Sequence, residues 1–180
     1  GIREDAFGNP IGKDIPGWQG CDRLPDMKLT GRICRLEPYD IAHAKGLYAH
    51  AKGLYAAYAR DDGSMWTYLP YGPFATLDAY RSFVADSYLK DDPLFHAIVD
   101  TASGRAVGVA SLMRIDPAPG VIEVGGIAYS PLLQRTPAAT EAMFLLMRRV
   151  FDELGYRRYE WKCDLLNAPS RAAAERYGFR

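Results

Sequence analysis

The sequence predicts a single α/β domain of the α+β type, with a central, mixed but mostly antiparallel β-sheet flanked by helices. Apolar and polar residues recur with the spacings of strand, helix, helix, three strands, helix, strand and helix, in that order. The links between the three consecutive strands are short enough to form antiparallel hairpins. A chain of 180 residues is also long enough to bury a sizeable core.

The first half of the chain divides into an arm and the start of the domain. Residues 1–27 are rich in Gly and Pro and lack a signal-peptide core, so we expect a surface arm, with the folded domain over 28–180. Arg32–Leu36 alternates polar and apolar residues as a half-buried strand does. The Ala-rich segment 40–59 has helical spacing and contains residues 42–48 repeated unchanged at 49–55, a duplication to which we assign no function.

The second half supplies most of the predicted sheet. A helix is expected over 76–89, with apolar residues recurring on one side. Three hairpin-linked strands follow, at Leu94–Asp100, Ala106–Arg114 and Val121–Ser130. Thr136 and Pro137 open a long amphipathic helix that Gly155 stops. A strand over Tyr159–Cys163 and a short helix over 167–177 complete the order.

The composition excludes several functional classes. The 22 Lys and Arg residues balance 22 Asp and Glu residues, so the chain lacks the basic excess of a nucleic-acid-binding protein. No apolar run approaches the about 20 residues that a membrane helix needs. Cys21, Cys34 and Cys163 are far apart and lack metal-ligand spacing, which favours reduced thiols in a cytoplasmic protein and indicates no metal site.

Three features that can carry chemistry lie close together in the sequence. Gly125 and Gly126 interrupt a β-branched strand, which indicates a bulge or a close approach of a ligand to the backbone. The same strand leads into the helix that begins at Thr136, whose N-terminus is a natural anion site. Glu123 lies two residues before the glycine pair and on the same side of the strand as Gly125. Each feature also has an ordinary structural explanation, but their succession is more specific.

The segment Gln134-Arg-Thr-Pro-Ala-Ala-Thr-Glu-Ala142 resembles the phosphate loop of the GNAT superfamily of acetyl-CoA-dependent N-acetyltransferases. A second signature, Asn167-Ala-Pro-Ser170 with Gly178-Phe179, is similar to the family's Asn-x-x-Ser and Gly-Phe pattern. The branch that the chain most resembles is that of the RimJ/RimL-like ribosomal-protein N-terminal acetyltransferases. The resemblance covers residues 28–180 and implies acetyl-CoA as co-substrate, an amine acceptor and no metal.

The resemblance also implies which residues hold acetyl-CoA. Its pantetheine is expected beside the bulged strand, near the backbone of Gly126, Ile127 and Ala128. Its phosphates are expected at the start of the long helix, on Gln134, Arg135, Thr136, Ala138, Ala139 and Thr140. Pro137 replaces a family glycine and has no N–H to offer, but proline suits a first helical turn, so we expect weaker or shifted phosphate binding. Asn167 is expected to bond the pantetheine.

For catalysis, Glu123 matches the position of the strand glutamate that some family members use as a base, and Ser170 lies near the expected thioester sulfur. The ordinary alternatives are a solvent-facing glutamate and, for Asn167 and Ser170, a helix cap. Ala174 stands where several family members have a tyrosine. The aromatic residues Trp66, Tyr68 and Tyr71 line an acceptor cleft or only cap the core.

The sequence leaves the acceptor and one competing function open. The acceptor is a protein N-terminus or a small amine, and Asp61 and Asp62 beside Arg60 do not amount to an acidic cleft. The competing function is a non-catalytic CoA-binding or scaffold protein, favoured by Pro137 and Ala174. The C-terminal hairpin of the family is missing after Phe179, which leads us to expect a truncated sequence or a homodimer in which a partner chain completes the sheet edge.

Overall fold

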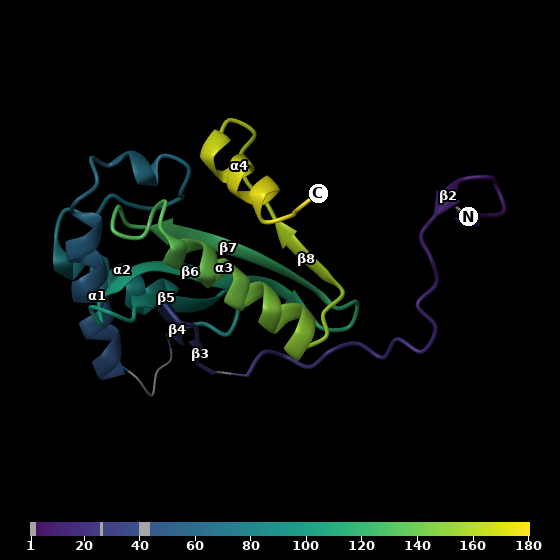
Figure 1. The fold of residues 1–180 in the computed structure, drawn as a ribbon, viewed down its shortest axis with the longest axis horizontal. Helices are drawn as coiled ribbons and strands as arrows, with labels where there is room; N and C mark the ends of the chain where they lie inside the picture. The colour runs from purple at the N-terminus through teal and green to yellow at the C-terminus, as the bar shows by residue number, and fades with distance from the viewer. Residues whose placement is uncertain (1–2, 26, 40–43) are drawn as a thin grey trace.

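Six strands form the central sheet in the order β3-β4-β5-β6-β7-β8, so each strand lies beside its neighbour in sequence (Figure 1). The computed structural model describes residues 3–25, 27–39 and 44–180, with side chains in all of these ranges except 44–49. Every pair in the sheet is antiparallel except β7 and β8, which run parallel because α3 connects them. The expected mixed, mostly antiparallel sheet with flanking helices is confirmed.

Five of the six strands of the central sheet correspond to predicted strands, and the short β3 was not predicted. The sheet comprises β3 (Leu29–Thr30), β4 (Cys34–Pro38), β5 (Leu94–Asp100), β6 (Ala106–Asp116), β7 (Val121–Tyr129) and β8 (Arg158–Trp161). The first predicted strand begins two residues later than expected. The reason is that the amides of Arg32 and Ile33 bind the carboxylate of Glu141 instead of a neighbouring strand.

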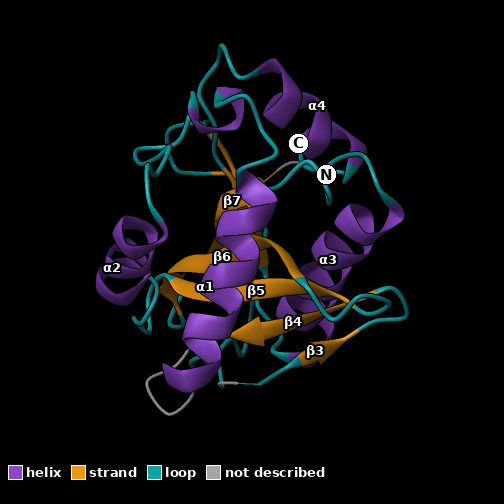
Figure 2. Ribbon diagram, turned by 90° about the vertical axis from the view of Figure 1, so that its left-hand side faces the viewer, coloured by secondary structure: helices purple, strands orange, loops and turns teal. Residues whose placement is uncertain are grey.

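Helices cover both faces of the sheet (Figure 2). They are α1 (Ala44–Tyr58), α2 (Leu77–Ser87), α3 (Pro137–Arg148) and α4 (Ala168–Arg176), with a short 3-10 turn η1 (Ser64–Trp66). The repeated segment begins outside the described residues, and its second copy lies within α1. The last predicted turn of the long helix is a π-helical turn, η2 (Arg149–Glu153), and Gly155 follows it at a φ of +70°.

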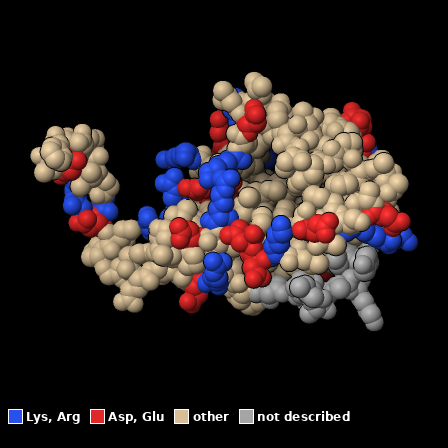
Figure 3. Space-filling view, turned by 180° about the vertical axis from the view of Figure 1, so that it is seen from behind, with Lys and Arg blue, Asp and Glu red and all other residues tan. Residues whose placement is uncertain are grey.

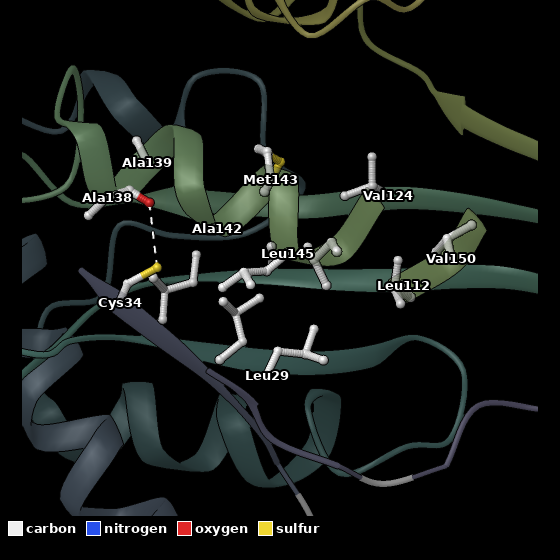
Figure 4. Close-up of a cluster of buried hydrophobic side chains, with 14 of the residues drawn as sticks. Leu29, Cys34, Leu112, Val124, Ala138, Ala139, Ala142, Met143, Leu145 and Val150 are labelled. Atoms are coloured by element: carbon white, nitrogen blue, oxygen red, sulfur yellow. Dashed lines mark hydrogen bonds between the residues drawn. The ribbon is translucent and has the colours of Figure 1, made fainter. Parts of the chain in front are cut away.

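Two hydrophobic cores lie on opposite faces of the sheet. One core packs α3 against β4, β6 and β7 and includes Leu112, Val124, Met143 and Leu145 (Figure 4). The other packs α1 and α2 on the opposite face and is rich in tyrosine, with Tyr58, Tyr80 and Tyr88 buried. Strands β5 to β7 are therefore buried on both faces, which explains the long apolar runs in their sequences. Within the described ranges, no helix combines the length and the apolar character that crossing a membrane requires.

The N-terminal arm makes a separate two-stranded hairpin, β1 (Arg3–Glu4) with β2 (Pro10–Ile11), away from the sheet (Figure 1). The second half of the arm contacts the folded domain. The indole of Trp18 donates to the carbonyl of Ala118 at 2.8 Å, and the amide of Cys21 donates to the carbonyl of Pro117 at the same distance. This part of the arm therefore packs on the turn between β6 and β7.

Glu141 fixes α3 to the first strands of the sheet. Its carboxylate accepts hydrogen bonds from the amides of Arg32, Ile33 and Cys34 at 2.7–2.8 Å. Burial opposes ionisation of the carboxyl, but these amides outweigh it and hold the pKa of Glu141 below its usual value of 4.5. Gly31 is required beside it, because a Cβ there would lie 2.5 Å from the Glu141 carboxylate.

We predict that Glu141→Ala lowers the free energy of unfolding at pH 7 by about 2–4 kcal/mol, since three amides lose a charged acceptor. Because the pKa is lower in the folded state, this stabilisation is present above the unfolded pKa and is lost as the pH falls through the folded pKa. Urea unfolding at pH 7 and near pH 3 measures both effects. Glu175→Gln, on the exposed face of α4, is the control. Equal destabilisation at both pH values would contradict the assigned ionic role.

Candidate active site

Strands β7 and β8 pair along only half of β7. Their parallel register runs from Val121 opposite Arg158 to Val124 opposite Trp161. Beyond this point β8 ends and the chain turns towards α4, while β7 continues to Tyr129 beside β6 alone. Among the described residues, no strand covers the other edge of β7 from Gly125 onward. This splayed edge offers unpaired backbone groups to a ligand that can lie alongside it.

The predicted bulge lies at the start of the splayed edge. Between the pairs Ser111–Gly125 and Val109–Ala128, β7 has one more residue than β6. Gly126 has a φ of +57°, and a Cβ there would lie 2.7 Å from the ring of Phe95. A Cβ on Gly125 would lie 2.5 Å from the sulfur of Met113, whose flexible side chain can move away. Gly126 is therefore the glycine that the bulge requires, at the pair where the sequence predicts a bulge.

The turn from β7 into α3 follows directly. Gln134 donates through its side-chain amide to the carbonyl of Tyr129 at 2.7 Å, which closes the turn. Thr136 is the N-cap of α3 and accepts the amide of Ala139, and Pro137 occupies the first helical turn. The amide of Thr136 also donates a hydrogen bond within the turn, to the carbonyl of Leu133.

Other groups of this turn remain available to an anion. Among the described residues, none accepts a hydrogen bond from the amides of Arg135 or Ala138. Arg135 has a φ of +60°, and its exposed guanidinium forms no ion pair within the described chain. Free amides at a helix N-terminus beside a guanidinium make a site that suits a phosphate. Thr140 is exposed in the first turn of the same helix.

The residues predicted at the last helix lie beyond the end of β8. Asn167 caps α4 by accepting the amide of Ser170 at 3.2 Å, so the capping alternative describes its side chain. The hydroxyl of Ser170 accepts a hydrogen bond from the indole of Trp161 at 2.9 Å. This bond ties α4 to the last residue of β8. A hydroxyl that accepts here keeps its own proton available as a donor.

Glu123 is buried between two cations. Its Oε2 lies 3.0 Å from a guanidinium nitrogen of Arg114 and 3.0 Å from the ammonium of Lys162. Lys162 also contacts Glu160 at 3.1 Å, so the cluster joins β6, β7 and the end of β8. The second oxygen, Oε1, accepts no hydrogen bond from a described residue. It faces Gly125, whose Cβ would lie 3.8 Å from it, so both residues share one side of the strand as predicted.

Of the three aromatic residues predicted to line an acceptor cleft, Trp66 and Tyr71 contact each other, with ring centroids 6.2 Å apart. Trp66 is buried against Tyr58, with ring centroids 5.1 Å apart, and it lines a cavity at the end of α1. Tyr68 is half-exposed and donates to the carbonyl of Leu166 just before α4. Tyr71 packs on Phe83 of α2, at a centroid distance of 4.5 Å. Tyr68 therefore lies near the start of α4, while Trp66 and Tyr71 both belong to the aromatic core.

Comparison with known proteins decides the family. Residues 36–180 match the family model described as the acetyltransferase (GNAT) domain. The chain belongs to the GNAT acetyltransferase family. A comparison with curated proteins finds no match.

Several solved structures resemble this GNAT acetyltransferase. A GCN5-related N-acetyltransferase from Brucella melitensis is 46% identical, with a TM-score of 0.85 over 92% of this chain and 73% of that chain. A GNAT-family protein from Chromobacterium violaceum is 37% identical, with a TM-score of 0.82 over 96% and 83% of the two chains. A Vibrio cholerae protein assigned as a ribosomal-protein-serine acetyltransferase is 19% identical, with a TM-score of 0.68 over 86% and 83%, and it supports the fold alone.

As a GNAT acetyltransferase, the protein uses acetyl-CoA, and the residues around the splayed edge fit this co-substrate. The free amides and guanidinium at the start of α3 suit its phosphates, and the uncovered edge of β7 suits the amides of its pantetheine. Within the described ranges, no group of three or more His, Cys, Asp or Glu side chains could hold a metal ion.

Sequence reasoning missed several residues that border this site. Arg114 and Lys162 contact Glu123 only because of a second bulge in β6 and the parallel register of β8, and neither has a local sequence signal. Tyr58 was also missed, although its hydroxyl donates to the carbonyl of Ala128 at 3.0 Å. Burial raises the pKa of Tyr58 well above its usual value, so this hydroxyl stays a donor. The position of Tyr58 in the predicted helix indicates a core residue, and the side chain is buried in the structure.

We predict that Gly126→Ala lowers the free energy of unfolding by about 2–4 kcal/mol. The alanine would have to adopt the left-handed conformation of Gly126, and its Cβ would press against the ring of Phe95. The substitution should also weaken acetyl-CoA binding, since relief of the contact flattens the bulge. Gly104→Ala is a matched control, because Gly104 has a φ of +66° and open space around it, and we expect a cost of only about 1 kcal/mol. Thermal unfolding and calorimetric titration with acetyl-CoA measure these effects. Equal losses in both variants would show that the bulge is not tightly packed.

Proposed function

We propose that this GNAT acetyltransferase moves the acetyl group from acetyl-CoA to a primary amine by direct attack within a ternary complex. The observation that carries the proposal is the splayed edge of β7, which lies between the free amides at the start of α3 and the start of α4. Phosphates at the helix N-terminus and pantetheine along the strand edge would direct the thioester to the bulge. Holding the two reactants in line supplies a large part of the acceleration.

In this proposal the pantetheine follows Gly126, Ile127 and Ala128, and a backbone N–H of this segment polarises the thioester carbonyl. Gln134, Thr136 and Ala139 maintain the turn through their internal hydrogen bonds, and Arg135, Ala138 and Thr140 face the phosphates. Asn167 holds the start of α4 at the thioester end. A fixed donor aimed at the developing oxyanion stabilises the transition state more than the ground state.

The chemical step forms one bond and breaks one. The neutral amine nitrogen attacks the carbonyl carbon, the C–N bond forms, and the C–S bond breaks to release the CoA thiolate. Glu123 accepts the excess proton of the nitrogen through Oε1, directly or through water, because this oxygen has no partner in the described chain while Oε2 is held by Arg114 and Lys162. Ser170 donates its hydroxyl proton to the thiolate and regains one from solvent.

The acceptor that this site takes is either a protein N-terminus or a small amine. The resemblance of the chain to the RimJ/RimL-like branch favours an N-terminus. The cavity lined by Tyr58, Asp61 and Asp62 favours a small amine with a second positive charge.

An acceptor panel tests the proposal. The protein is incubated with acetyl-CoA and N-terminal peptides, polyamines or aminoglycosides, while the release of the free CoA thiol is followed. We expect thiol release that depends on one acceptor class. Binding of acetyl-CoA without thiol release on any acceptor would favour a non-catalytic CoA-binding or scaffold protein instead.

We predict that Glu123→Gln lowers kcat/KM about a hundredfold near pH 7 and much less at high pH, where the free amine is abundant and needs less help. The pH–rate profile measures this difference. Lys162→Met is the control, because it disturbs the same ion cluster without removing the carboxylate. An unchanged profile in Glu123→Gln would remove Glu123 from the proton transfer. A profile that changes equally in both variants would assign the effect to the cluster.

A further inference from the structure

A cavity of about 240 Å³ lies at the C-terminal end of α1. Aromatic rings from α1, η1 and the following loop form its walls, chiefly Tyr55, Tyr58, Trp66 and Phe74. These rings are fixed by their mutual contacts. Trp66 meets Tyr58 and Phe74 edge to face, at centroid distances of 5.1 and 5.6 Å. The walls of the cavity are therefore preformed and largely apolar, as small-molecule sites are.

Two carboxylates complete the lining of this cavity. Asp61 and Asp62 both line it, at the turn between α1 and η1. Asp61 uses one oxygen, Oδ2, to accept the amides of Gly63 and Met65, and Asp62 accepts the amide of Ser64 through Oδ1. Neither carboxylate forms an ion pair with any residue that the structure describes. The cavity thus combines aromatic faces with uncompensated negative charge.

A cavity of this composition selects for a cation. Aromatic faces attract a cationic group through their quadrupoles, and carboxylates attract it through their charge. Asp61 is half-buried and Asp62 is exposed, so a cationic group against the aromatic faces gains a charge attraction that a neutral apolar group of the same shape lacks. The cavity volume suits one ammonium or guanidinium group with its adjacent methylenes, and it is too small for a folded peptide.

Tyr58 connects the cavity to the edge of β7. Its side chain forms part of the cavity wall, and the hydroxyl of the same side chain donates to the carbonyl of Ala128 on the splayed edge of β7. Tyr58 therefore contacts both the cavity and the strand that carries the bulge. An acceptor with two nitrogen centres a few methylenes apart can occupy both positions together.

We propose that this cavity is the specificity subsite of the acceptor and that it binds a second cationic group of the amine substrate, an ammonium or guanidinium distinct from the nitrogen that is acetylated. The inference rests on the proposed amine acetylation. The preferred acceptors are small diamines, guanidino amines or amines with a basic side chain. Asp61 and Asp62 supply the charge, and Trp66 and Tyr58 supply the aromatic faces.

Two isosteric amines test this subsite. (5-Aminopentyl)trimethylammonium has one reactive amine and a permanent remote charge, and 6,6-dimethylheptan-1-amine has the same shape with carbon in place of the charged nitrogen. We expect the wild-type protein to show a KM about tenfold lower for the charged amine. In Asp61→Asn/Asp62→Asn the two KM values should converge, with the KM of acetyl-CoA and of the neutral amine unchanged.

Matched variants keep the result interpretable. Asp86→Asn/Asp152→Asn removes the same charge from two exposed positions outside the cavity, and it should preserve the tenfold preference. Asp62→Asn alone keeps the hydrogen bonds that Asp61 accepts from Gly63 and Met65, so this variant should fold even where the double variant does not. Because it removes one of the two negative charges, it should reduce the preference for the charged amine. Equal KM values for the two amines in the wild type, or a preference that survives in both cavity variants, would overturn the assignment.

A binding measurement separates this inference from the proposed function. Calorimetric titration with the charged amine reports on the cavity whether or not acetyl transfer occurs. Binding that is lost in the Asp62→Asn variant, with no thiol release on any acceptor, would support the cavity and refute the proposed amine acetylation. Acetylation of both amines at equal KM would support the proposed function and refute the cavity.

Discussion

The whole site depends on one property of β7, which has two strand neighbours along its first half and one along its second. Beyond Val124, where pairing with β8 ends, β7 changes from an internal strand to an edge strand of the same sheet. The bulge at Gly126 lies just past this point and turns the free edge away from the regular ladder. The same strand then leads into the N-terminus of α3. A single strand therefore orients both ends of the proposed acetyl-CoA site.

Two carboxylates keep this geometry in place, and each does so by serving several segments at once. Glu141 holds α3 to the turn before β4 through three amides, so the helix cannot slide along the sheet. Glu123 gathers Arg114 of β6 and Lys162 after β8 beside the last paired residues, so the strands stay joined up to the point of separation. Basic and acidic side chains are interspersed on the face of the molecule that Figure 3 shows.

Local patterns in the sequence predict the elements well because the signals are local. Leu94–Asp100 is predicted exactly, Thr136 caps its helix as expected, and the Gly125–Gly126 pair marks a real bulge. The predictions lose accuracy where a distant residue decides the outcome. The start of β4 depends on Glu141, more than a hundred residues away. The surroundings of Glu123 depend on the register of three strands and on a bulge in β6. Alternation along one strand predicts which face of the sheet a residue occupies, but it does not predict which residues of the neighbouring strands lie beside it.

The balance of charge along the sequence likewise does not predict which substrate charge the folded protein selects. Asp61 and Asp62 follow Arg60, so along the chain they belong to a segment with a net charge of only −1. In the fold the two carboxylates line a cavity with aromatic rings, and no described cation pairs with them there. A charge acts through the distance and the dielectric that surround it, and both are properties of the folded chain. A net charge of zero therefore excludes long-range attraction of a polyanion, but it leaves room for a strongly selective cation site.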